Sequence, residues 1–277
     1  MANERNDVQE LKNLRKQIFV TGYKGKMAHL ASCYSCLETI YALYLKDVLR
    51  YDPQNPKWED RDRFILSKGH AGLALYGVMV KAGLVSEEMY NSYLQENCRI
   101  GGEPCMRDSE WIEATTGSLG HGLSMGVGVA MALKMNHSPA KVYVMLGDGE
   151  CEEGTVWEAA MSAAAFQLDN LVVILDCNKI QKMDYVSKTM GPEKWHEKWS
   201  AFGFTTDDVD GHDVDKVAQT LKQPNAPGMP RLVIAHTVKG KGVSIMENNP
   251  NWHFKLPGRK ELKIFKSELD IQDWELE

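Results

Sequence analysis

The feature that most constrains the fold is a strand, turn, helix and strand unit in the middle of the chain. Two apolar runs, 141–146 and 171–177, flank a glycine-containing turn and a small-residue helical stretch at 153–167. Asp148 lies in that turn, and Asn178 follows the second run thirty residues later. One helical crossover between neighbouring parallel strands fills this spacing, so we expect both side chains at the carboxyl edge of one sheet.

Patterns on either side of this unit predict a larger α/β fold, in which helices flank a central parallel sheet. Further strands are expected in FILSKGHAG, which places His70 at a strand-to-helix turn, and at 231–238. Helices are predicted at 8–25, 35–50, 71–82, from Ser86, 121–135 and 259–268, with an irregular stretch at 97–118. Because no repeat or linker interrupts the pattern, we expect a single domain over residues 1–277.

Charge and hydropathy narrow the function classes. The formal net charge of -6 argues against a nucleic-acid partner, because phosphate recognition needs a basic surface. No apolar run reaches the roughly 18 residues that a membrane span requires, and the amino-terminal residues lack the layout of a signal peptide. We therefore expect a cytoplasmic protein that has no membrane partner.

Cys33 and Cys36 form a C-x-x-C pair that admits two interpretations. Such a pair can be redox-active or provide half of a zinc site, but the matching second pair is missing, because Cys98 and Cys105 are seven residues apart. The pair also lies in a run with helical apolar spacing. This spacing favours ordinary packing in the core.

The polar residues around the central turn are suited to a hard metal ion. The Asp148 carboxylate, the Asn178 amide oxygen and the Ile180 carbonyl form an oxygen donor set of the kind that Mg²⁺ prefers, with positions left for phosphate oxygens and water. Gly147 and Gly149 let the backbone turn tightly, and the helix that starts near Glu153 directs its positive end into the same space. Alternatively, GDG alone is only a common turn between a strand and a helix.

Several short motifs, taken in order, narrow the interpretation. They are AHLAS at 28–32, LSKGHA at 66–71, TTGSLGHG at 115–122, the GDG turn with Asn178, DGHD at 210–213, and HTVKGKG followed by WHF. With them, the chain from about 11 to 260 resembles the amino-terminal, diphosphate-binding domain of transketolases, and this span is the expected core of the domain. The resemblance implies an enzyme of carbohydrate metabolism that transfers a two-carbon ketol unit. The donor would be a phosphorylated or otherwise anionic ketose and the acceptor an aldose.

The resemblance also implies two cofactors, thiamine diphosphate and Mg²⁺. Other divalent cations such as Ca²⁺ or Mn²⁺ can substitute for the Mg²⁺. Its predicted metal ligands are Asp148, Asn178 and Ile180. Its predicted cofactor-binding residues are Ser32, His70, Gly117, Ser118, Leu119, Gly149, Glu150, Asn178, Lys239 and His253. The predicted catalytic residues are His29, His70 and His253, because imidazole can exchange protons with sugar hydroxyls near neutral pH.

Two glutamates and one missing histidine complete the comparison with the family. Glu153 and Glu158 match glutamates that link the two active sites at the family's subunit interface, although they could simply favour the first turns of a helix through its dipole. Many transketolases carry a substrate-facing histidine before the TTG motif, whereas this sequence reads RIGGEPC at 99–105. His121 replaces a family glutamine, and an imidazole there could take over part of the lost function or serve an unrelated one.

The family's pyrimidine-binding domain carries the glutamate that activates the cofactor, and no residue here matches it. We therefore expect a separate C-terminal transketolase subunit, comprising a pyrimidine-binding and a C-terminal domain, in a two-fold heterotetramer that acts on sugars. The alternatives are a subunit related to deoxyxylulose-phosphate synthase or to the alpha chain of a 2-oxoacid dehydrogenase, a non-catalytic cofactor-binding module, and a zinc-binding scaffold.

Overall fold

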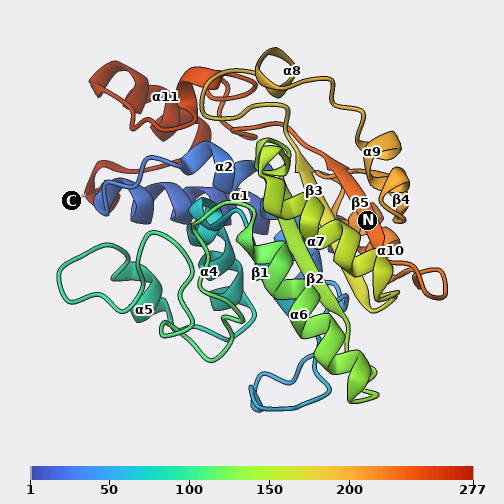
Figure 1. The fold of residues 1–277 in the computed structure, drawn as a ribbon. Coiled ribbons are helices and arrows are strands. Elements are labelled where there is room, and N and C mark those ends of the chain that lie inside the picture. Colours follow the sequence, from blue (N-terminus) through green and yellow to red (C-terminus); the bar gives the residue numbers. More distant parts are fainter. Residues whose placement is uncertain (1, 277) are drawn as a thin grey trace.

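The structure is a computed structural model that describes residues 2–276, and its centre is a parallel sheet of five strands (Figure 1). The strands are β1 (Arg63–Leu66), β2 (Val142–Gly147), β3 (Leu171–Cys177), β4 (Thr205–Asp210) and β5 (Arg231–His236). Their order across the sheet is β1-β2-β3-β5-β4, and every neighbouring pair runs parallel. The expected α/β fold is therefore confirmed.

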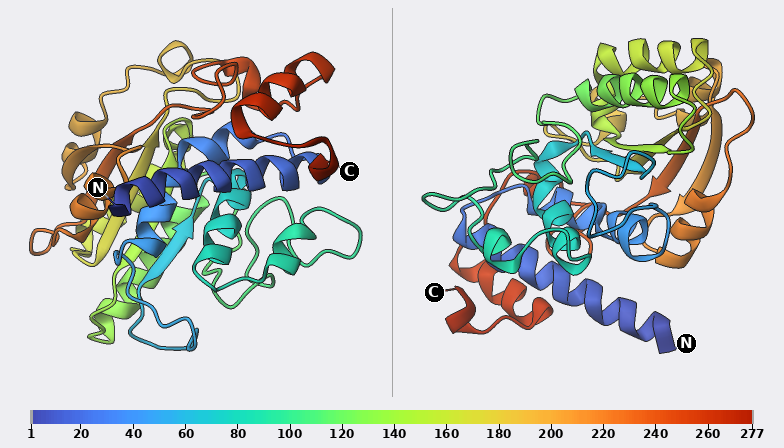
Figure 2. Two further views of the ribbon diagram at one scale, coloured as in Figure 1. Left: turned by 180° about the vertical axis from the view of Figure 1, so that it is seen from behind. Right: turned by 90° about the horizontal axis from the view of Figure 1, so that it is seen from below.

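Helices cover both faces of the sheet, which gives three layers. On one face lie α1 (Ala2–Lys24), α3 (Leu37–Leu45), α4 (Gly72–Lys81) and α10 (Val214–Lys222), and on the other α6 (His121–Met135), α7 (Gly154–Ala165) and α9 (Trp195–Ala201). In Figure 2, α6 and α7 lie on the opposite side of the sheet from α1. Among residues 2–276, no helix is both long enough and apolar enough to cross a bilayer.

The two faces of the sheet are filled by alternating residues of the same strands, as the period of two requires. In β2, Val142 and Val144 pack under α6 and α7, whereas Tyr143 and Met145 face the layer of α1, α3 and α4. Strands β2 and β3 are buried on both faces, which explains their nearly continuous apolar sequence.

The remaining helices lie between these elements or follow β5. They are α2 (Leu30–Ser35), α5 (Glu87–Asn91), α8 (Val186–Thr189), α11 (Arg259–Leu269) and the 3₁₀ turns η1 (Gly69–Ala71), η2 (Gly149–Glu152), η3 (Pro250–Trp252) and η4 (Asp273–Leu276). Residues 97–118 contain no helix or strand, as expected.

Two parts of the predicted pattern were wrong or incomplete. The helix expected at 35–50 corresponds to α3, which begins at Leu37 and ends at Leu45 because Asp47 adopts a left-handed conformation with φ of 53°. The short helix α2, which ends just before it at Ser35, was not predicted. The prediction also missed α8, α9, α10 and β4. Because β4 is an edge strand rich in aspartate and threonine, it lacks the apolar run of a central strand.

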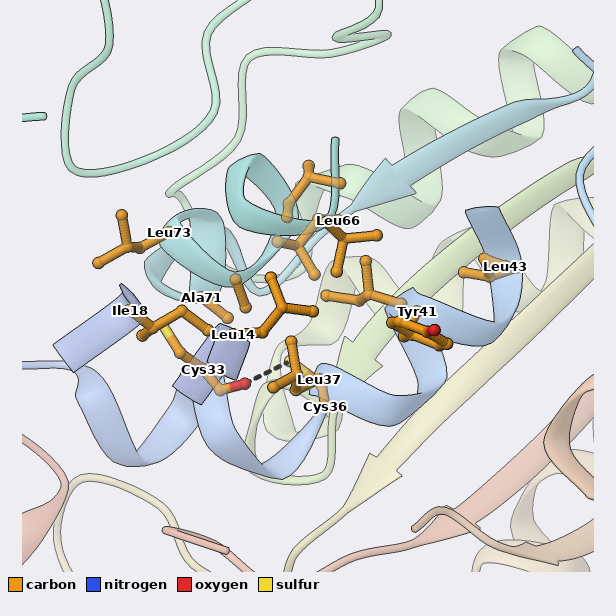
Figure 3. Packing of buried hydrophobic residues seen from close by; sticks show 14 of the residues in the cluster. Leu14, Ile18, Cys33, Cys36, Leu37, Tyr41, Leu43, Leu66, Ala71 and Leu73 are labelled. Atoms are coloured by element: carbon orange, nitrogen blue, oxygen red, sulfur yellow. Dashed lines mark hydrogen bonds between the residues drawn. The ribbon is translucent and has the colours of Figure 1, made fainter. Parts of the chain in front are cut away.

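Cys33 and Cys36 lie in the core beside Leu14, Ile18 and Leu37 (Figure 3). Both thiols are free and buried, and the Cys36 thiol donates to the Ser32 carbonyl at 3.2 Å. Among the side chains that the structure describes, no three of His, Cys, Asp or Glu form a group that could hold a metal ion. The expected packing role of the pair is confirmed.

Helix α6 packs close to the sheet through small residues on one face. Gly126 lies so near β2 that an added Cβ would overlap the Val144 side chain, whereas a Cβ on Gly128 would meet nothing within 4 Å. Gly126→Ala should therefore lower the free energy of unfolding by about 1–3 kcal/mol through overpacking. Gly128→Ala should raise it by about 0.5–1 kcal/mol, because alanine favours a helix. Urea unfolding of both variants checks this prediction, and equal effects of the same sign would contradict it.

Candidate active site

A cavity of about 290 Å³ opens at the carboxyl edge of the sheet, where β1, β2 and β3 end. Its walls come from the turns after these strands and from the segments that carry His29, Glu103, Lys239 and His253. The lining residues are His29, Lys68, His70, Glu103, Gly117, Leu119, Gly147, Asp148, Gly149, Glu150, Asn178, Ile180, Gln181, Lys182, Lys239 and His253. Most of the residues predicted from the sequence therefore meet in one place.

Asp148 and Asn178 follow the ends of neighbouring strands, as their spacing predicted. Gly147, the last residue of β2, is in register with Asp176 of β3. Asp148 follows Gly147, and Asn178 follows Cys177, the last residue of β3. The Asp148 carboxylate accepts a hydrogen bond from the backbone N–H of Gly149 at 2.8 Å and another from Lys179. The carboxylate is thus fixed over the turn that contains Asn178.

The donor set fits a divalent cation. Asp148 is 1% exposed and has no ion-pair partner among the described residues. Its pKa is raised to about 7, mainly because the carboxylate is buried and secondly because the negative charge of Asp176 lies nearby. A bound cation would compensate this buried charge. Asn178 and Ile180 line the same cavity, and the Asn178 amide oxygen and the Ile180 carbonyl would provide two further hard oxygen donors.

Positive and donor groups face the same cavity. The Lys239 ammonium donates to the Ile180 carbonyl at 2.8 Å and lies 2.9 Å from Nδ1 of His253. Burial, and then the neighbouring Lys68 ammonium, lower the pKa of Lys239 to about 8. An anionic ligand such as a diphosphate would relieve this repulsion, so the cavity also fits the anionic part of the predicted cofactor.

Three histidines cluster on the cavity wall. His29 precedes α2, His70 lies in η1 after β1, and His253 follows η3. The ring centroids of His29 and His70 are 5.1 Å apart, and those of His29 and His253 are 5.7 Å apart. Sequence positions 29, 70 and 253 are therefore neighbours only in the folded chain.

The three imidazoles are neutral at neutral pH. Burial and then the Lys239 charge lower the pKa of His29 to about 4 and that of His253 to about 3. Burial and then Lys68 hold the pKa of His70 well below its ordinary value. Neutral imidazole has one donor and one acceptor nitrogen, so each ring can exchange a proton with a hydroxyl group.

Removing the Lys239 charge should raise the histidine pKa values. In Lys239→Met, the protonated forms of His29 and His253 lose a repulsive neighbour, so both pKa values should rise towards 6.5. NMR titration of the imidazole nitrogens measures this change. Lys241→Met removes a charge from the same turn without lining the cavity and should leave both values unchanged. Unchanged titration in Lys239→Met would contradict the prediction.

Four predicted residues do not line the cavity. Ser32 is fully buried behind it, with a hydroxyl group that has no partner among the described residues. Ser118 is exposed at the edge of the TTG segment. Glu153 and Glu158 are exposed at the start of α7 and in its second turn, so they are available to another chain.

Two other placements refine the sequence prediction. Glu150 lines the cavity, but its carboxylate already accepts hydrogen bonds from Ser67, from Gly120 N–H at 2.8 Å and from Gly147 N–H at 3.0 Å. It therefore fixes the turn on which Asp148 lies. His121, considered as a substitute for the missing histidine, is exposed and does not line the cavity.

Sequence reasoning missed a buried ion pair beneath the cavity. The Lys68 ammonium contacts the Asp176 carboxylate, and both side chains are at most 2% exposed. Asp176 also accepts hydrogen bonds from Ser35 at 2.6 Å and from the Asn178 amide at 2.9 Å. Asp176 thereby orients Asn178. Lys68 lies in the LSKGHA motif, which was a usable signal, but its partner is 108 residues away.

Other cavity residues that the sequence did not single out are Glu103, Gln181 and Lys182. Gln181 donates to Glu152 at 2.7 Å and packs against Gly149, where an added Cβ would lie 2.6 Å from the Gln181 Cβ. The close approach requires glycine at position 149. Lys182 stacks over Phe254, with its ammonium 4.8 Å from the ring centre.

Comparison with known proteins places this arrangement in a family. A family model described as "Transketolase, thiamine diphosphate binding domain" matches residues 23–275. An apulose-4-phosphate transketolase subunit from Phocaeicola vulgatus is 40% identical over 258 residues, which cover 93% of this chain and 91% of that protein. The 6-deoxy-6-sulfo-D-fructose transketolase subunit SqwG from a Clostridium species is 37% identical over 249 residues, which cover 89% and 90%.

Solved structures of longer proteins share the fold. Transketolase from Leishmania mexicana matches with a TM-score of 0.83 at 26% identity, over 97% of this chain and 43% of that one. Transketolase from Campylobacter jejuni matches with a TM-score of 0.83 at 27% identity, over 95% and 43%. The chain therefore spans about two fifths of the length of these solved transketolases.

Proposed function

This chain belongs to the transketolase family through its thiamine diphosphate binding domain, and from that premise we propose that it is one subunit of a two-chain transketolase. The reaction would move a two-carbon ketol unit from an anionic ketose to an aldose. The observation that carries the proposal is a single cavity that joins a buried oxygen donor set to three neutral imidazoles. The relatives at 40% and 37% identity are themselves named as transketolase subunits.

Thiamine diphosphate and a divalent cation, with Mg²⁺ as the proposed ion, would bind in this cavity. Asp148, Asn178 and the Ile180 carbonyl would hold the cation, and Lys239 and His70 would face the diphosphate. When bound, the cofactor supplies the nucleophilic carbon for two-carbon transfer. The Ser32 hydroxyl, which is buried and has no hydrogen-bond partner among the described residues, would be a further donor.

The histidines would handle the protons of the sugar. His29 and His253 are neutral and can accept a proton from a substrate hydroxyl or donate a hydrogen bond to its oxygen. The His29 ring also makes a tilted contact with the Phe254 ring, with centroids 4.7 Å apart.

A second chain would complete the site. We propose a C-terminal transketolase subunit that supplies the pyrimidine-binding part and its activating glutamate, in a two-fold heterotetramer located in the cytoplasm. Glu153 and Glu158 would lie at the shared interface, which is supported by their exposure. Residues 1–277 would act as a single diphosphate-binding domain.

Reconstitution tests this proposal. The chain is mixed with its candidate partner, thiamine diphosphate, Mg²⁺, a ketose phosphate donor and an aldose acceptor, and the sugar products are measured. Turnover should require both chains and should fall to background when either chain is omitted. His29→Asn in the complete mixture should lower kcat by about 100-fold, the usual contribution of a proton-transferring group, while cofactor binding persists.

Three outcomes would contradict the proposal. Turnover by the isolated chain would exclude the shared site. Decarboxylation of pyruvate in place of ketol transfer would favour an enzyme related to 2-oxoacid dehydrogenases. Tight binding of thiamine diphosphate without turnover, with a partner that itself carries the activating glutamate, would favour a non-catalytic module.

A further inference from the structure

The segment 101–105 places an acidic side chain on the cavity wall. The carboxyl carbon of Glu103 lies 2.8 Å from the position that a Cβ of Gly117 would occupy, and one carboxylate oxygen lies still closer to it. Gly117 has a φ of 132°, a conformation that favours glycine. The carboxylate of Glu103 thus fills the space in which a side chain at position 117 would lie.

The backbone that carries Glu103 is fixed. Pro104 is buried, and its ring packs against Gly72, where an added Cβ would lie 2.9 Å from the Pro104 Cδ. The Pro104 carbonyl accepts a hydrogen bond from the Thr116 N–H at 3.0 Å. The segment is therefore tied both to the start of α4, just after His70, and to the residue that precedes Gly117.

Among the acidic side chains of the cavity wall, Glu103 is the one to which no other role is assigned. The carboxylate of Asp148 belongs to the predicted cation site, and the carboxylate of Glu150 is occupied by three hydrogen bonds. Glu103 is exposed, and within residues 2–276 its side chain makes no hydrogen bond or ion pair. A free carboxylate in a site rich in lysine and histidine can accept hydrogen bonds from a ligand.

We propose that Glu103 determines the substrate class: its carboxylate accepts hydrogen bonds from sugar hydroxyls and rejects donors that bring a negative charge to this part of the cavity. The inference rests on the transketolase function proposed above and deepens it. A carboxylate offers two acceptor oxygens, so it can bind neighbouring hydroxyl groups of a neutral polyol. A second negative charge at the same place would be repelled. The anionic end of a ketose would therefore lie away from Glu103.

Two donors that share a hydroxymethyl ketone test this selectivity. L-Erythrulose continues beyond the ketone with neutral hydroxyl groups, whereas hydroxypyruvate continues with a carboxylate. The holoenzyme with its partner subunit is assayed with each donor and glycolaldehyde as the acceptor. In Glu103→Gln, the ratio of kcat/KM for L-erythrulose to kcat/KM for hydroxypyruvate should fall by about tenfold, chiefly through KM. Thermal stabilisation by thiamine diphosphate and Mg²⁺ should stay as in the wild type.

Glu110→Gln is the matched control, because Glu110 lies in the same irregular stretch but outside the cavity, next to Lys57. It should leave the donor ratio unchanged. If the wild-type complex turns over and Glu103→Gln has the same donor ratio as the wild type, this inference alone is overturned. The same holds if Glu110→Gln changes the donor ratio as much as Glu103→Gln does. Loss of cofactor binding in Glu103→Gln would assign the carboxylate to the cofactor instead. No turnover of any ketose by a wild-type complex that binds the cofactor would overturn the proposed function as well.

Discussion

Replacing Asp148 with asparagine should abolish the metal-dependent binding of thiamine diphosphate. Asparagine keeps the size of the side chain and one oxygen acceptor, but it removes the buried negative charge that a divalent cation would neutralise. The wild-type complex, at a cofactor concentration 100 times Kd, should gain about 2.7 kcal/mol of stability from the ligand, and the variant should gain almost none. Thermal unfolding with and without the cofactor and Mg²⁺ measures the difference.

Asp169 provides the control for this experiment. It lies before β3, at the opposite edge of the sheet, and forms an exposed ion pair with Lys134 at 2.8 Å. Asp169→Asn should cost less than about 1 kcal/mol of stability and should leave the ligand-induced stabilisation intact. If Asp148→Asn bound the cofactor and Mg²⁺ as tightly as the wild type, the predicted cation site would be wrong.

Replacing Asp176 with alanine should destabilise the chain itself. The change leaves the Lys68 ammonium buried without its ion-pair partner and removes the acceptor for Ser35 and for the Asn178 amide. Removal of one partner of a buried pair costs about 3–5 kcal/mol, so the free energy of unfolding should fall by that amount. Denaturant unfolding of the chain in the absence of cofactor gives the value.

A double variant separates the lost charge pair from the lost volume. Lys68→Met with Asp176→Leu removes both charges and fills the space with apolar atoms, so it should recover much of the stability that Asp176→Ala loses. Lys134→Met, which breaks an exposed pair, should cost less than about 1 kcal/mol. A loss below about 1 kcal/mol in Asp176→Ala would mean that the buried pair contributes little to stability.

Much of the fold could be predicted because its signals are local. The apolar runs of β2, β3 and β5 and the small-residue pattern of α6 each identify their element without reference to the rest of the chain. Helix α10 could also have been found, since the Asp213 side chain caps it by accepting from the Lys216 N–H at 3.1 Å, and its buried residues have helical spacing. The acidic edge strand β4 had no comparable signal.

The sequence by itself determined that Asp148 and Asn178 lie near one another, because a single crossover of thirty residues restricts how far apart two neighbouring strand ends can be. It could not determine that Lys68 pairs with Asp176, or that Glu103 faces the cavity beside Gly117. Lys68 and Asp176 are 108 residues apart, and their contact depends on the strand order β1-β2-β3-β5-β4. The contact of Glu103 with Gly117 depends on how the irregular stretch packs over η1 and α4. Local patterns fix elements and short connections, whereas the free energy of packing the whole core decides which distant residues meet.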